Sequence, residues 1–185
     1  WAGAWIGDNR DINYKPAPIS EKHSTPKRKS NPPERTSPSP VYTNYTSTER
    51  KFGNHRLEPL YTRFDRRNFY VTYDVTKQLQ KGKNAIGVLL GNGWYNHQSK
   101  AVWDFDRARA QPPRFLMDLR ITYEDGTTEV IRSERDWKTS SGAFDFNSIY
   151  TAEHYDARLE QKGWNTADFD DSKWKEAGYR AVPSQ

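Results

Sequence analysis

The chain has 185 residues and a mass of 21.6 kDa, enough for one ordinary domain or for one domain with a short appendage. It has no cysteine, which excludes disulfides and thiolate ligands or nucleophiles. The net charge of +5 and the mean hydropathy of −1.10 would suit a disordered chain, but aromatic residues make up 14% of the sequence and disordered chains are poor in them. The sequence therefore combines two unlike parts.

The N-terminal residues 1–14 are interpreted as a lead-in. They open with Trp1-Ala2-Gly3-Ala4-Trp5, which has neither the basic flank nor the apolar stretch of a signal peptide. The longest apolar run, residues 85–90, is far shorter than the ~20 residues that a membrane-spanning helix needs. We therefore expect a soluble chain without a membrane partner, either mature or a piece of a longer protein.

Residues 15–51 form a distinct segment rich in proline, serine and lysine. It carries the whole +5 net charge and seven of the eleven prolines, whereas the rest of the chain is neutral overall. Proline removes a backbone donor, and the sparse apolar residues cannot offset the entropy of ordering, so a loop or disordered insert is predicted. No aromatic residues alternate with Lys27-Arg28-Lys29, and we therefore expect no nucleic-acid partner.

From residue 52 onward the sequence predicts short strands. Residues 70–76 are rich in β-branched and aromatic residues, residues 81–84 read as a turn, and residues 85–90 are interpreted as a strand buried on both faces. Residues 115–123 alternate apolar with mostly polar side chains, which places Asp118 and Arg120 on the wetter face.

Asp125-Gly126 then predicts a tight hairpin into residues 128–131. Further strands fit around Trp137 and over residues 149–155. The expected fold is all-β, a two-sheet antiparallel β-sandwich or jelly roll over residues 52–180, of the kind found in carbohydrate-binding modules. Residues 181–185 are interpreted as the start of a linker.

Few residues fit a metal or catalytic pattern. The four histidines are scattered, with no metal-ligand spacing between any two of them. Asp104 and Asp106 point the same way on an extended chain, so they could flank a substrate or bind Ca²⁺, but two solvated acids near Arg107 and Arg109 are the favoured interpretation.

The strongest candidate for a binding site follows the predicted buried strand. Glycines at 91 and 93 permit an unusual turn, an exposed Trp or Tyr ring can stack on a pyranose, and Asn and His can reach its hydroxyls. The alternative is that the two rings turn inward and cap the core. The candidate carbohydrate-binding residues are Asn92, Trp94, Tyr95, Asn96, His97 and Trp103.

A second cluster, residues 163–174, is acidic and bracketed by Trp164 and Trp174. It could pass for a metal loop. However, Asp170 and Asp171 also fit the N-terminal cap of a single helical turn, and we expect this turn to pack Trp174 on the sheet.

These motifs resemble the N-terminal β-sandwich domain of bacterial α-L-rhamnosidases. The resemblance covers roughly residues 55–180 and is carried by Leu89-Leu90-Gly91-Asn92-Gly93-Trp94-Tyr95 and Tyr155-Asp156-Ala157-Arg158, with weaker support from residues 70–76, 121–126 and 164–174. Trp5-Ile6-Gly7-Asp8 resembles the segment that precedes this domain.

The resemblance implies a module ahead of an (α/α)₆ barrel that hydrolyses terminal α-L-rhamnose with inversion. The family's catalytic acid and base lie in that barrel, so no catalytic residue is carried over to this chain. It also implies a periplasmic or extracellular location, and some related modules bind rhamnose with help from Ca²⁺. The implied partners are rhamnoside carbohydrates and a downstream catalytic domain.

Residues 15–50 depart from the family. There the family has strands of the Tyr-Glu-x-Tyr-Ile-Asn-Gly-Lys-x-Val-Gly kind, and only Lys51-Phe52-Gly53 resembles the end of that pattern. Either the segment is a surface loop and the sheet is incomplete, or these residues are not those of the chain that fills this space. We favour the second alternative, which predicts paired strands whose Ser and Lys side chains face the core.

Three functions are compatible with the sequence. The expected one is a non-catalytic accessory domain of an α-L-rhamnosidase, for substrate recognition or as a scaffold. The alternatives are an autonomous lectin-like β-sandwich that binds carbohydrate and, less favoured, a small hydrolase in its own right.

Overall fold

The computed structural model describes residues 1–11, 16–25, 35–37, 39–41, 46–47, 60–96, 111–149 and 152–182. Within these residues the regular structure consists of short strands and one 3₁₀ helix, η2 (Ala157–Leu159). In this part of the chain no helix has the length and apolar content to cross a membrane. The described fold is all-β with several small antiparallel sheets, which confirms the predicted class.

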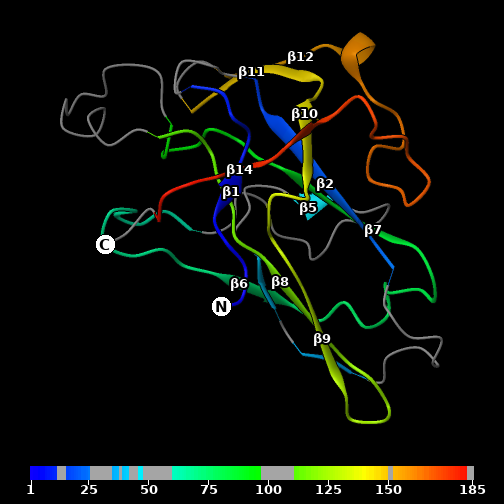
Figure 1. Cartoon of the computed structure of the whole chain (residues 1–185). Helices are drawn as coiled ribbons and strands as arrows, with labels where there is room; N and C mark the ends of the chain where they lie inside the picture. The colour runs from blue at the N-terminus through cyan, green and yellow to red at the C-terminus, as the bar shows by residue number, and fades with distance from the viewer. Residues whose placement is uncertain are drawn as a thin grey trace.

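The largest sheet has five strands and runs through the centre of the molecule (Figure 1). One of its inner strands, β7 (Asn84–Leu89), forms because residues 85–90 are apolar and suit a buried extended chain. All of its pairings are antiparallel. In spatial order the strands are β13 (Lys175–Glu176), β10 (Lys138–Ser141), β2 (Pro18–Ser24), β7 (Asn84–Leu89) and β5 (Thr46–Ser47).

The second sheet contains the predicted hairpin. Its order is β3 (Arg35–Ser37), β8 (Asp118–Thr122) and β9 (Thr128–Arg132). Gly126 has φ 77°, a left-handed conformation that costs glycine little, and the hairpin prediction is confirmed.

Three two-stranded sheets complete the described structure. They pair β4 (Ser39–Val41) with β6 (Val71–Tyr73), β11 (Phe144–Ser148) with β12 (Ala152–Tyr155), and β1 (Ile6–Gly7) with β14 (Gly178–Tyr179).

The core cluster contains residues of both the five-stranded and the three-stranded sheets. The alternating apolar residues of segment 115–123 are all buried, and the ring of Phe115 lies 4.9 Å from that of the fully buried Trp137. Ile86 and Val88 of β7 belong to the same cluster. Burial of each such side chain contributes roughly 1.5–3 kcal/mol, so this cluster is the main source of stability.

Asp118 corrects the sequence prediction for β8. It was expected on the wetter face, but only 1% of its surface is exposed. Its two carboxylate oxygens accept the backbone N–H groups of Ala2 and Gly3 at 2.9 and 2.7 Å, so the N-terminal residues cover this position. Arg120 is exposed, as predicted.

The loop prediction for residues 15–51 is wrong where the structure describes them. β2, β3, β4 and β5 all fall in this segment and pair with other strands. Most of the remainder of the predicted loop, which includes residues 26–34, lies outside the described residues.

The register of β2 shows which of its side chains face the core. Ser20 lies opposite Val88 and Lys22 lies opposite Ile86, and directly paired residues point to the same side of a sheet. Ser20, Lys22 and Ser24 therefore lie on the core side of β2.

Trp174 is buried, as expected for the second cluster. Its backbone N–H donates to the carbonyl of Asp171 at 2.8 Å, and its indole N–H donates to Gln161 Oε1 at 2.8 Å. The ring of Phe169 packs edge-on against it. This confirms a packing role for the tryptophan.

Candidate functional site

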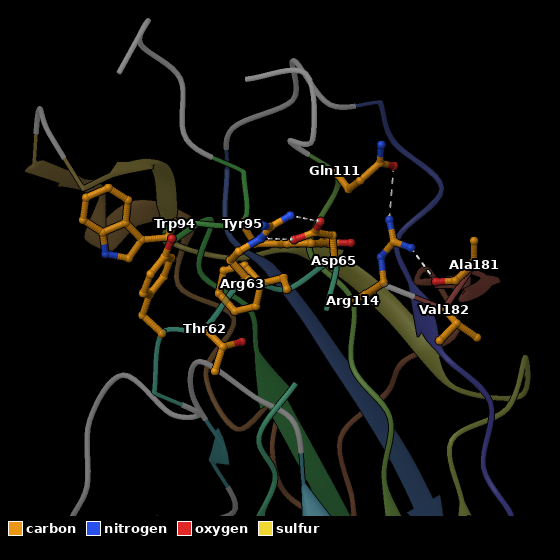
Figure 2. A pocket seen from close by; sticks show the side chains of 11 residues that line it. Thr62, Arg63, Asp65, Trp94, Tyr95, Gln111, Arg114, Ala181 and Val182 are labelled. Carbon is orange, nitrogen blue, oxygen red and sulfur yellow. Dashed lines mark hydrogen bonds and ion pairs between the residues drawn. The ribbon is translucent and has the colours of Figure 1, made fainter. Parts of the chain in front are cut away.

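A cavity of about 340 Å³ opens beside the turn that follows β7 (Figure 2). This volume lies within the ~300–1,000 Å³ range of small-molecule sites. The turn at 93–96 and the loop at 61–65 supply most of its wall, and the last described residues of the chain close one side. The lining residues are Tyr61, Thr62, Arg63, Phe64, Asp65, Trp94, Tyr95, Gln111, Arg114, Ala181 and Val182.

Buried asparagines hold the turn in place. The backbone N–H of Asn92 donates to Asn147 Oδ1 at 2.7 Å, and its side-chain amide donates to the Asn147 carbonyl at 3.1 Å. The amide of Asn96 donates to Asn92 Oδ1 at 2.9 Å. Asn92 and Asn96 are 1% and 0% exposed, so these two predicted binding residues position the turn from beneath it.

Two exposed aromatic rings form one edge of the cavity. Trp94 is 48% exposed and Tyr61 is 58% exposed, with ring centroids 5.6 Å apart and planes tilted by 57°. Phe64 packs edge-on against Tyr61 at 5.6 Å and supports it from behind. Such rings offer a flat apolar surface with polar edges, the chemistry that suits stacking on a sugar ring.

Tyr95 and Arg114 form the inner part of the cavity. The guanidinium carbon of Arg114 lies 5.3 Å from the centroid of the Tyr95 ring, a cation–π geometry. Burial raises the pKa of Tyr95 and lowers that of Arg114. Arg114 also donates to Gln111 Oε1 at 3.3 Å and to the carbonyl of Ala181, which ties the C-terminal residues to the cavity (Figure 2).

Asp65 is the one acidic residue among those that line the cavity. Both of its oxygens are engaged by Arg63, at 2.7 and 3.1 Å. A glycosidase needs two carboxyl groups on opposite sides of the scissile bond. The described cavity therefore has the groups to bind a polar ring but lacks a pair of acids to cleave a glycosidic bond.

The structure brings together only some of the predicted site residues. Trp94 and Tyr95 line the cavity. His97, Trp103, Asp104 and Asp106 lie outside the described residues, so their roles in sugar or Ca²⁺ binding remain predictions.

The lining residues Tyr61, Arg63 and Arg114 were missed by the sequence analysis. The run Tyr61-Thr62-Arg63-Phe64-Asp65 alternates aromatic and charged side chains outside any predicted strand, and this pattern could have identified the loop as a candidate.

One cluster of possible metal ligands occurs among the described residues. Donor atoms of Glu21, His23 and Asp171 lie within 4.8 Å of one another. Burial, followed by the charge of Asp171, raises the pKa of Glu21 to about 8. A metal ion would have to displace the proton of Glu21, and we assign no metal to this cluster.

Comparison with known proteins identifies the relatives of the chain. Residues 44–185 match the family model "Alpha-L-rhamnosidase N-terminal domain". An α-L-rhamnosidase of Formosa agariphila is 42% identical over 127 residues, which is 67% of this chain and 13% of that protein.

Two solved structures have the same fold. The α-L-rhamnosidase of Dictyoglumus thermophilum matches 99% of this chain with a TM-score of 0.82 and 30% identity, and that of Aspergillus terreus matches 97% with a TM-score of 0.86 and 27% identity. The chain covers 21% of each of these structures. It belongs to the α-L-rhamnosidase N-terminal domain family and corresponds to one part of much longer enzymes.

Proposed function

We propose that the chain is a non-catalytic accessory domain of an α-L-rhamnosidase and that it recognises rhamnoside glycans at the Trp94 cavity. The observation that carries the proposal is the pair of exposed rings, Trp94 and Tyr61, at the edge of a cavity of sugar-binding size. Family membership supplies the substrate class of the parent protein.

The proposed architecture is a two-sheet sandwich. β7 of the five-stranded sheet and β8 and β9 of the three-stranded sheet contribute to a single core cluster, as expected for two sheets packed face to face. The cavity then lies at one end of the sandwich, where connecting segments supply binding residues.

Isothermal titration of the chain with L-rhamnose and methyl α-L-rhamnoside tests the proposal. We expect a dissociation constant of about 1 mM, and Trp94→Ala is expected to weaken binding by about tenfold because the stacking surface is lost. Trp1→Ala is the matched control, since Trp1 is 58% exposed but does not line the cavity. Absence of any binding would reject sugar recognition and leave a scaffold role.

Hydrolysis is expected only from the parent enzyme. The chain alone should release no p-nitrophenol from p-nitrophenyl-α-L-rhamnoside, because Asp65 is ion-paired and no second acid lines the described cavity. Measurable cleavage by the purified chain would favour the small-hydrolase alternative.

A further inference from the structure

Two buried positions on the core face of β2 hold serine, whereas such positions usually hold large apolar side chains. Ser20 is fully buried and Ser24 is 9% exposed, on the same side of the sheet as Ile86 and Val88. The Ser24 hydroxyl has no hydrogen-bond partner. A central strand between two others normally places large apolar residues at such positions, because they fill the core without leaving polar groups unpaired.

The opposite face of β2 has a second conflict. Glu21 is fully buried, and neither carboxylate oxygen has a hydrogen-bond partner. Burial, followed by the charge of Asp171, opposes its ionisation, and His23 Nε2 lies 3.4 Å from Glu21 Oε1. A metal ion would satisfy Glu21 but would leave the core face unexplained.

We propose that residues 20–50 are encoded in a reading frame displaced by one nucleotide from that of the rest of the domain. This inference goes beyond the proposed function and is independent of it. The backbone of β2 pairs within the sheet, whereas the buried side chains of Glu21 and Ser24 lack hydrogen-bond partners there. A frame that is displaced by one nucleotide at one point and restored at a second point produces this combination. Triplets read one nucleotide earlier would then specify the side chains that the sheet needs.

The genetic code supports the proposal at β2. If Ser20 and Ser24 have TCN codons, the triplet that begins one nucleotide earlier encodes Phe, Leu or Ile at position 20 and Phe or Leu at position 24. Both buried serines thus become large apolar residues. At position 21 the earlier frame encodes Arg or Gly, provided that it contains no stop codon there. An arginine at this position would place a positive charge beside the carboxylate of Asp171.

The same shift gives residues 43–50 the sequence pattern of a strand followed by a turn. The codon of Tyr45 always becomes Leu, because the preceding Asn codon ends in C or T. Thr43 and Thr46 become Tyr or His, and a TCN codon at Ser47 becomes Phe, Leu, Ile or Val. At positions 48 and 49 the allowed residues include Asn-Gly, the strongest short hairpin signal.

The shifted codons permit Tyr-Glu-Leu-Tyr-Ile-Asn-Gly-Lys at positions 43–50. This run matches the strand pattern that the family resemblance implies for this part of the chain, and the end of that pattern follows in the present frame at Phe52-Gly53. β5 lies in the shifted run and pairs with β7. The two displacements are therefore expected near codons 19–20 and 50–51.

The sequence comparisons match less of the chain than the fold comparisons do, and the family model begins at residue 44, inside the proposed segment. Sequence similarity to the Formosa agariphila enzyme covers 67% of the chain, whereas fold similarity to the Dictyoglumus thermophilum enzyme covers 99%. The wider region 15–51, which contains this segment, carries the whole net charge of +5 and seven of the eleven prolines, whereas the rest of the chain is neutral overall.

The nucleotide sequence of the gene is the direct test. We expect TCN codons at Ser20, Ser24 and Ser47, and an earlier frame that is free of stop codons from codon 20 to codon 50. An AGY codon at Ser24 or Ser47, or a stop codon in that frame, would overturn the proposal.

A stability measurement tests it at the level of the protein. Adding volume to a well-packed core normally destabilises it by about 1–3 kcal/mol, so a gain from larger residues is diagnostic. We expect Ser20→Leu/Ser24→Phe to raise Tm by about 5 °C in the full chain. Ser172→Leu, at an exposed turn, is the control and should give no gain. A lower Tm for the double variant would contradict the proposal.

Discussion

Glu21 lies in an environment that does not suit a charged carboxylate. Its carboxyl group is buried in β2 without a hydrogen bond. Burial, aided by the negative charge of Asp171, raises its pKa from 4.5 to about 8. The folded state therefore binds a proton that the unfolded state releases above pH 4.5, and the His23 imidazole lies 3.4 Å from the Glu21 carboxyl group.

Glu21 should make the stability of the fold depend on pH. The pKa of Glu21 is higher in the folded state than in the unfolded state, so its protonated carboxyl group contributes most to the free energy of unfolding below pH 4.5. This contribution is lost as the pH rises toward 8. The free energy of unfolding should fall by about 1.4 kcal/mol per pH unit in this window, as measured by urea denaturation. Glu21→Gln should remove that slope. The exposed Glu153→Gln should keep it, and an unchanged slope in Glu21→Gln would contradict the account.

Asp118 shows how a residue's partners can reverse a pattern-based prediction. Alternation in residues 115–123 correctly predicted the buried apolar set, because the period of a strand is local. It could not predict that residues at the N-terminus cover the other face, since Ala2 and Gly3 lie more than a hundred positions away.

Removing the Asp118 carboxylate should destabilise the fold. Asp118→Ala leaves two backbone N–H groups without their acceptor, and we expect a loss of about 2–3 kcal/mol in chemical denaturation. Asp118→Asn retains one acceptor oxygen and should lose less. Asp145→Ala, at an exposed position of β11, serves as the control, and an equal effect of the two alanine variants would refute the role of Asp118.

The turn after β7 is held in place by hydrogen bonds to Asn147 of β11. The sequence indicated a polar, glycine-flanked turn and left open whether its two aromatic rings face solvent or the core, and Trp94 is exposed. The roles of Asn92 and Asn96 could not be predicted, because their hydrogen-bond network depends on Asn147, which lies 55 residues beyond Asn92.

Asn147→Ala should therefore weaken both the fold and the site. Loss of its side-chain acceptor leaves the buried N–H of Asn92 unpaired, and we expect about 2 kcal/mol less stability by urea denaturation. Trp94 fluorescence should shift because the turn that carries it is less well fixed. Glu153→Ala, opposite Asn147 on β12, is the control, and an unchanged spectrum in Asn147→Ala would count against this support.

For the whole molecule, the sequence predicted the all-β class and several individual strands, but it did not predict which strands lie next to each other in the sheets. The hairpin of β8 and β9 and the buried strand β7 were predicted because their signals are local. The placement of β2 between β10 and β7 was not, because strand pairing is long-range and the side chains of β2 do not follow a strand pattern. A displaced frame in residues 20–50 accounts for that failure.

The most direct test of recognition without hydrolysis is saturation-transfer NMR of methyl α-L-rhamnoside with the purified chain. We predict transfer to the sugar that is strongly reduced in Trp94→Ala, with no accumulation of free rhamnose in the same sample. Free rhamnose released over time, or the absence of transfer at millimolar sugar, would contradict the account.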